Sequence, residues 1–158
     1  MNTAETLGKI LISKGLTIST TESCTGGLLS SKLTDVSGSS SYIRLNLVTY
    51  ANEAKQKMLG VEKNILDTKG AVSEECAFQM AKGLYDLTKS DICVSTTGIA
   101  GPTGGTKDKP VGLMYSCIYT PDKCKIYKIL KPSITPRIQM KELFAEDVLK
   151  NILTFIED

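Results

Sequence analysis

Histidine is absent from all 158 residues of the chain, and this absence limits its chemistry more than any other feature of the composition. Histidine supplies the base of Ser-His and Cys-His catalytic pairs and is a common ligand of metal ions. A hydrolase built on this chain must therefore take its general base from a lysine, a tyrosine or a carboxylate.

Cysteine pairs with the spacing of a metal site are also absent. The five cysteines are odd in number and include no Cys-x-x-Cys pair, so the sequence indicates neither a disulfide framework nor a zinc site. We expect all five to be free thiols.

Long apolar runs and a strong net charge are lacking as well. No stretch approaches the length of a membrane span, and residues 1–5 lack the basic and apolar regions of a secretory signal. The net charge of +2 argues against a dedicated nucleic-acid partner. We therefore expect a cytoplasmic protein that binds neither membrane nor nucleic acid, and its length fits a single domain over residues 1–158.

Helical and strand patterns alternate along the chain. Helices are expected over residues 3–14, 26–35, 53–59, 62–68, 74–88 and from 136 to near the C-terminus, and strands over 16–19, 42–50, 91–95, 111–119 and 125–130. The predicted helix caps are Asn52, Ser73 and Thr135, and the acids Glu22, Glu53, Glu74 and Glu75 are interpreted as capping or surface groups. The last two strands should form an antiparallel hairpin. This order of elements predicts an α/β fold, a three-layer α/β/α sandwich around a mixed β-sheet.

The stretch from Thr20 to Gly27, TTESCTGG, lies between a predicted strand and a predicted helix. A turn at this place presents backbone N–H groups and the positive end of a helix dipole beside Ser23, so it can hold an anion or stabilise an oxyanion. The alternative is that Ser23 or Thr25 only caps the helix and that the glycines only allow the chain to turn. A second glycine-rich segment, 96–106, follows another strand, and its part from Gly98 to Thr106 can cradle a phosphate or an oxyanion through backbone N–H groups or simply close a loop.

Lys55 and Arg137 each fall in the first turn of a predicted helix, where the helix dipole disfavours a cation by about 0.3–1 kcal/mol. Either residue alone is more often a solvated surface side chain. Together with Ser23 they indicate helix ends that point at one anionic ligand. Positive potential makes a lysine lose its proton more easily, so Lys55 could accept the Ser23 proton directly or through Tyr50. Cys24 is a weaker candidate for a nucleophile because no histidine lowers its pKa.

The order and spacing of five segments closely resemble the CinA C-terminal domain family. These segments are TESCTGG (21–27), VTYANEAK (48–55), GAVSEE (70–75), TGIAGPTGGT (97–106) and KPVG (109–112). The resemblance implies a nicotinamide mononucleotide deamidase, which hydrolyses the carboxamide to give nicotinate mononucleotide and ammonia in pyridine nucleotide (NAD) recycling. It also implies a homodimer with a metal-free α/β/α fold and no cofactor. Family members also occur fused to an N-terminal molybdopterin-binding-like domain, and this chain looks like the deamidase part standing alone.

By this resemblance, the family's catalytic serine, tyrosine, lysine and arginine correspond to Ser23, Tyr50, Lys55 and Arg137. Ser23 would attack the carboxamide, and Lys55 and Tyr50 would manage its proton. Arg137 would either bind the substrate phosphate or orient the loops. Substrate-binding groups, including the N–H groups that hold the oxyanion, are expected on the two glycine-rich segments. These residues are Thr25, Gly26, Gly27, Gly98, Ile99, Ala100 and Gly101.

Three residues depart from the family pattern. Leu45 and Asn46 stand where glycine is expected, and Lys141 stands where a second arginine is usual. Lysine cannot reproduce a bidentate guanidinium contact. These departures keep a second hypothesis open, a non-catalytic nucleotide-binding module of the same fold. A third hypothesis is a structural partner domain that acts through dimerisation alone.

Overall fold

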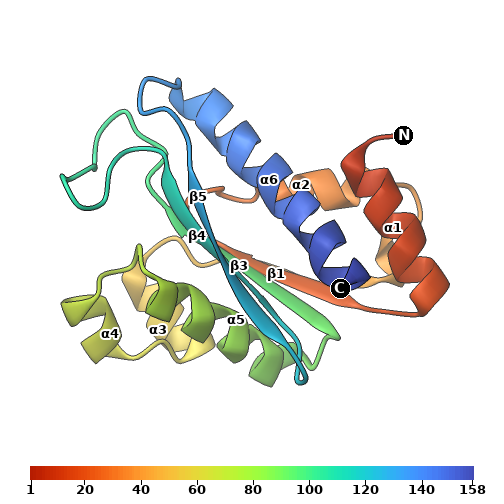
Figure 1. Cartoon of the computed structure of the whole chain (residues 1–158). Coiled ribbons are helices and arrows are strands. Elements are labelled where there is room, and N and C mark those ends of the chain that lie inside the picture. Colours follow the sequence, from red (N-terminus) through yellow and green to blue (C-terminus); the bar gives the residue numbers. More distant parts are fainter.

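A five-stranded mixed β-sheet lies between two layers of helices in the computed structural model, which describes residues 1–158 (Figure 1). The strands are β1 (Ile18–Glu22), β2 (Ile43–Val48), β3 (Ile92–Gly98), β4 (Leu113–Tyr119) and β5 (Cys124–Leu130). The helices are α1 (Thr3–Lys14), α2 (Leu28–Thr34), α3 (Asn52–Leu59), α4 (Lys63–Thr68), α5 (Glu74–Thr88) and α6 (Arg137–Glu157), with a short 3-10 helix η1 (Ser39–Ser41). The predicted three-layer α/β/α sandwich is confirmed.

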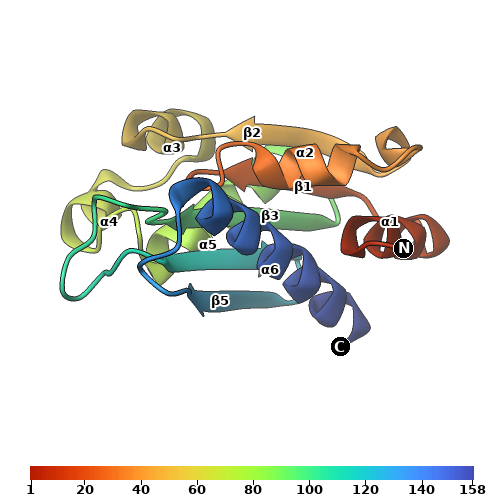
Figure 2. The same cartoon turned by 90° about the horizontal axis from the view of Figure 1, so that it is seen from above.

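The direction of the strands decides which loops meet. The sheet order is β2-β1-β3-β4-β5, in which β1 runs parallel to both neighbours and β3, β4 and β5 pair antiparallel (Figure 2). In the sheet register Glu22 lies opposite Val48 on one side and Thr96 on the other. The parallel strands therefore end at the same edge, where ligands bind in sheets of this kind.

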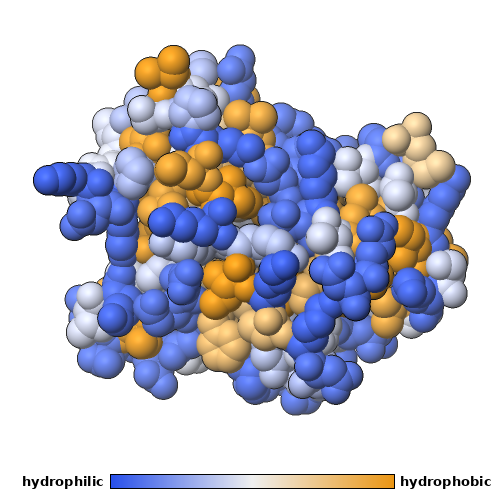
Figure 3. All heavy atoms as spheres, in the orientation of Figure 1, coloured by the Kyte–Doolittle hydropathy of each residue, from blue (hydrophilic) through white to orange (hydrophobic).

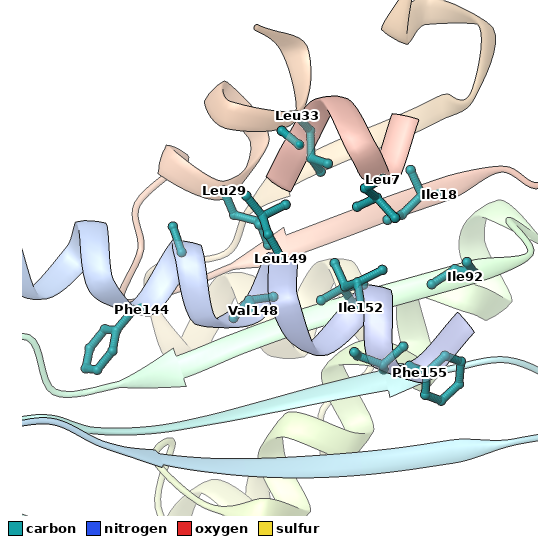
Figure 4. Close-up of a cluster of buried hydrophobic side chains, with 14 of the residues drawn as sticks. Leu7, Ile18, Leu29, Leu33, Ile92, Phe144, Val148, Leu149, Ile152 and Phe155 are labelled. Atoms are coloured by element: carbon teal, nitrogen blue, oxygen red, sulfur yellow. The ribbon is translucent and has the colours of Figure 1, made fainter. Parts of the chain in front are cut away.

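Helix α6 closes the core on one face of the sheet, beside α1 and α2, while α3, α4 and α5 cover the opposite face (Figure 1). Its side chains at helical spacing point toward the strands and toward Leu29 and Leu33 of α2 (Figure 4). The buried residues of α6 are Met140, Phe144, Ala145, Val148, Leu149, Ile152 and Phe155. Burial of each large apolar side chain contributes about 1.5–3 kcal/mol, which holds the N-terminal end of α6 at the sheet edge described above.

Strand β1 is longer than the sequence pattern predicts. It begins at Ile18 and continues to Glu22, so the first three residues of the stretch assigned to a turn are strand, and all five residues of β1 are buried. Parallel pairing on both sides makes it a central strand, and its hydroxyls are satisfied by side chains. Thr20 donates to Asn46 Oδ1 at 2.8 Å, and the Thr21 hydroxyl bonds to that of Thr49 at 2.8 Å.

Two of the three predicted helix caps are wrong by one residue. The N-cap of α3 is Ala51, with Asn52 as its first helical residue, and the N-cap of α6 is Pro136. The Thr135 hydroxyl instead donates to the carbonyl of Pro132 at 2.7 Å. The predicted cap of α5 is confirmed, because the Ser73 hydroxyl accepts from the backbone N–H of Cys76.

The surface carries apolar side chains in separate patches among hydrophilic ones (Figure 3). The most exposed large apolar residues are Ile134, in the loop before α6, and Ile138, in the first turn of α6. None of the helices combines the length and the apolar character that crossing a bilayer requires. All five cysteines are free thiols.

Gly83, in the middle of α5, allows α3 to pack closely, and this generates a stability prediction. A Cβ at this position would lie 1.9 Å from the carbonyl oxygen of Leu59, the last residue of α3. Alanine favours an isolated helix by about 1 kcal/mol over glycine, but overpacking costs about 1–3 kcal/mol. Gly83→Ala should therefore lower the free energy of unfolding, measured by urea denaturation. The exposed control Asp86→Ala on the same helix should change it by about 0.5 kcal/mol or less; a stabilised Gly83→Ala would contradict the packing argument.

Candidate active site

Three loops follow the parallel strands and meet at one edge of the sheet. Strand pairing continues beyond the strand ends, since Thr49 N–H donates to the Glu22 carbonyl at 2.9 Å and Ser23 N–H donates to the Thr96 carbonyl at 3.0 Å. These bonds hold the Ser23 turn between the loop that contains Tyr50 and the glycine-rich loop after β3. The topology therefore brings together residues that lie far apart in the sequence.

Lys55 reaches this edge from the first turn of α3. The helix turns Lys55 and Leu59, which are four positions apart, toward the interior, and Lys55 is only 1% exposed. Its Nζ lies 3.1 Å from Ser23 Oγ and 2.9 Å from the carbonyl oxygens of Thr49 and Tyr50. No carboxylate forms an ion pair with Lys55. The contact between the predicted nucleophile and the predicted base is direct.

This set of partners accommodates both protonation states of Lys55. Burial lowers the pKa of the amine because a charged group is poorly solvated there. As a neutral amine, Lys55 donates its two N–H groups to the two carbonyls, and its lone pair accepts the hydroxyl proton of Ser23. As an ammonium ion, it donates to all three oxygens. The geometry is that of a general base that becomes a general acid after one proton transfer.

Arg137 and Tyr50 connect the loops around the cleft. Arg137 is the first residue of α6; one guanidinium nitrogen donates to the Gly101 carbonyl at 2.6 Å and the other to the Tyr50 hydroxyl at 3.3 Å. These two contacts connect the glycine-rich loop to the Tyr50 loop, and the remaining N–H groups of the guanidinium are available to an anion. Tyr50 bonds to Lys55 through its carbonyl, not through its hydroxyl.

A cleft of about 270 Å³ opens between these loops. Its lining residues are Cys24, Tyr50, Gly98, Ile99, Ala100, Gly101, Thr103, Gly104 and Arg137. Ser23 and Lys55 are not part of this lining but adjoin it. Ser23 directly precedes Cys24 in the chain, and Lys55 Nζ donates to the Tyr50 carbonyl. Two larger hollows, of about 390 and 720 Å³, lie elsewhere and contain none of the predicted site residues.

The predicted binding residues 98–101 line the cleft, whereas Thr25, Gly26 and Gly27 do not. Thr25 is fully buried and its hydroxyl bonds inward, so only its backbone can meet a ligand. Gly26 and Gly27 have φ values of 59° and 102°, which glycine adopts without strain. The N–H groups of Cys24, Thr25 and Gly27 have no acceptor within the protein. These groups are available to an oxyanion.

Cys24 faces the cleft beside Ser23, but its thiol is a poor nucleophile. Burial raises its pKa to about 12, so the thiol remains protonated at neutral pH. This environment agrees with the expectation from the sequence that Cys24 is a weaker candidate for the nucleophile than Ser23.

The three departures from the family pattern do not share one location. Leu45 packs against the apolar cluster on the α5 side of the sheet, and Asn46 accepts the bond from Thr20. Lys141 lies one turn after Arg137, with its Nζ 3.3 Å from where a Cβ on Gly26 would be. Only Lys141 therefore borders the candidate site, and it carries the same positive charge as the arginine that is usual at this position.

Glu22 and Thr96 were not predicted as site residues. Glu22 was interpreted as a capping or surface group, and it does accept the N–H groups of Leu29 and Ser30 at the start of α2 while being fully buried. The Thr96 hydroxyl accepts the Ser23 N–H at 3.2 Å. The usable sequence signal was the polar run Ser19–Glu22, which continues directly from the predicted strand 16–19; had it been read as part of that strand, its polar groups would have required buried partners.

Comparison with protein-family models matches residues 1–156 to the CinA C-terminal domain. The chain belongs to this family. A CinA-like protein from Chloroherpeton thalassium is 49% identical to it over 147 residues, which are 92% of this chain and 35% of that protein. The resemblance inferred from the five sequence segments is confirmed.

Solved structures of CinA proteins have the same fold. The competence/damage inducible protein CihA from Agrobacterium tumefaciens is 36% identical, with a TM-score of 0.90 over 98% of this chain and 96% of that chain. A CinA superfamily protein from Escherichia coli is 27% identical, with a TM-score of 0.91 over 97% and 88% of the two chains. The chain spans only 35% of the length of the Chloroherpeton relative. An activity of such a longer protein can therefore only be proposed for this chain.

The lowered pKa of Lys55 predicts how stability depends on pH. The ordinary lysine pKa is 10.5, and the folded protein releases this proton at a lower pH. Between these two values the unfolded state binds more protons, so stability rises with pH there. Relative to Lys55→Met, which lacks the titrating group, the wild type should gain stability as the pH rises through this interval. Urea unfolding at several pH values measures the difference.

The control for this experiment is Lys57→Met, on the same helix, where the lysine side chain is 78% exposed. Its stability should follow that of the wild type at each pH. Parallel curves for the wild type and Lys55→Met would contradict a lowered pKa of Lys55.

Proposed function

We propose that this chain is a nicotinamide mononucleotide amidohydrolase with Ser23 as nucleophile and Lys55 as general base. The observation that carries the proposal is the 3.1 Å contact between Lys55 Nζ and Ser23 Oγ. A buried lysine with a lowered pKa and no ion pair can act as a neutral base at a pH where an exposed lysine is charged. Membership of the CinA family supports the choice of substrate.

The reaction begins when Ser23 Oγ attacks the carboxamide carbon and its proton passes to Lys55 Nζ. The N–H groups of Cys24, Thr25 and Gly27, which have no acceptor within the protein, are candidates for stabilising the oxyanion. As the C–N bond breaks, Lys55 gives its proton to the leaving nitrogen, which departs as ammonia. Water then attacks the acyl-enzyme and transfers a proton to Lys55. Breakage of the ester returns that proton to Ser23 and releases nicotinate mononucleotide.

The charges around the cleft support an anionic substrate. Arg137 lines the cleft and Lys141 lies beside Gly26, and neither cation forms an ion pair with a carboxylate. A phosphate group on the ligand would supply the missing negative charge. A mononucleotide with one phosphate therefore suits this edge of the sheet.

Release of ammonia from nicotinamide mononucleotide tests the proposal. The wild type should produce ammonia, and Ser23→Ala and Lys55→Met should each lower kcat by at least about 10³-fold, because nucleophile and base act as a unit. Lys57→Met, the exposed lysine of the same helix, should keep wild-type activity. If the wild type releases no more ammonia than Ser23→Ala, the enzyme proposal is lost, and binding without hydrolysis would favour the nucleotide-binding module.

Arg137→Lys tests the proposed role of the guanidinium. A lysine has one terminal nitrogen and cannot bridge the Gly101 carbonyl and the Tyr50 hydroxyl at once. The loops then lose their common anchor, and kcat/KM should fall by about 10- to 100-fold. The control is Arg44→Lys on β2, an exposed arginine outside the cleft, which should leave kcat/KM unchanged. Equal kinetics for both variants would exclude an orienting role for Arg137.

A further inference from the structure

Glu22 is a fully buried carboxylate that no part of the proposed mechanism uses. It has no cationic partner, and its two oxygens accept four hydrogen bonds. Two come from the backbone N–H groups of Leu29 and Ser30, and one comes from the Ser30 hydroxyl. The fourth comes from the Thr25 hydroxyl at 2.6 Å. The first three hold the start of α2, whereas the fourth leads back to the nucleophile turn.

The hydrogen bonds beyond Thr25 form a chain with a single direction. The one hydrogen of the Thr25 hydroxyl is donated to Glu22, so the 2.9 Å bond between the Thr25 and Thr96 hydroxyls must use the hydrogen of Thr96. The Thr96 hydroxyl oxygen in turn accepts from the Ser23 N–H at 3.2 Å, and this N–H is shared with the Thr96 carbonyl oxygen at 3.0 Å. The order is Ser23 N–H to Thr96, Thr96 to Thr25, and Thr25 to the Glu22 carboxylate.

We infer that Glu22 is a positioning residue that acts through Thr25 and Thr96 to hold the backbone of Ser23 for attack. The buried charge fixes the direction of each hydroxyl, because only a carboxylate accepts at both oxygens and donates at neither. The chain fixes Ser23 from its amide side, and Lys55 contacts the same residue at Oγ. The inference rests on the proposed function for its kinetic consequence, since a serine held from both sides matters only if it reacts.

The competing explanation is that Glu22 only caps α2, and the two arms of its hydrogen bonding can be separated. Thr96→Val keeps the shape of the side chain and breaks the arm that leads to Ser23. Ser30→Ala removes one donor from the capping arm. Ser116→Ala is a matched control, because Ser116 is the register partner of Thr96, is fully buried and has no hydrogen-bond partner.

The experiment measures kcat and KM with nicotinamide mononucleotide, the thermal midpoint, and NMR hydrogen exchange at the Ser23 amide. We expect Thr96→Val and Glu22→Gln to lower kcat by about 10- to 100-fold, with KM changed by no more than about twofold, because a misplaced nucleophile slows the chemical step. The Ser23 amide should exchange several-fold faster in Thr96→Val. Thr96→Ser, which keeps the hydroxyl, should restore both values. Ser30→Ala should lower the thermal midpoint alone, and Ser116→Ala should change nothing.

An unchanged kcat and an unchanged Ser23 exchange rate in Thr96→Val would overturn the inference, as would failure of Thr96→Ser to restore them. Thr96→Val decides the question even if Glu22→Gln does not fold. A wild type without ammonia release would overturn the proposed function instead. The exchange rate of the Ser23 amide would then still decide whether the chain from Glu22 holds the turn.

Discussion

Burial of a lysine away from every carboxylate is the constraint on which the candidate site depends. Glu22 and Lys55 are the two buried charged residues of the chain, and they lie on either side of Ser23 without pairing. An ion pair would keep Lys55 protonated, because an opposite charge favours the charged form. Backbone carbonyls satisfy its N–H groups without fixing its charge. The amine is thereby held in place and remains able to change its protonation state.

The sheet topology makes this arrangement possible. Strands β1, β2 and β3 run parallel and end together, so three loops supply Ser23, the carbonyls that hold Lys55 and the wall of the cleft. Helix α3 directly follows the loop that contains Tyr50, which places Lys55 at this edge of the sheet, in contact with Ser23. The apolar stripe of α6 fixes the position of Arg137 from the opposite layer. Each of the two helix layers therefore contributes one charged group to the same edge of the sheet.

Local patterns in the sequence predicted the elements and the charged residues, and could not predict the polar network. Helical periodicity located α1, α5 and α6, and the conflict with the helix dipole singled out Lys55 and Arg137. Thr96 was assigned to a loop, although it lies in β3 and bonds to Ser23 and Thr25, more than seventy positions earlier. Such bonds depend on strand order, which periodicity does not encode. The close packing at Gly83 was likewise invisible, since its neighbour belongs to another helix.

One physical cause explains why the serine, and not the adjacent cysteine, suits the role of nucleophile. Burial disfavours the charged form of any group, so it raises the pKa of the Cys24 thiol to about 12 and lowers that of the Lys55 amine. The thiol consequently loses its reactive form, while the amine gains the form that can accept a proton. A hydroxyl needs no ionisation before attack if a neutral base contacts it. With histidine absent, the same buried environment favours the proposed Ser-Lys pair over a thiolate.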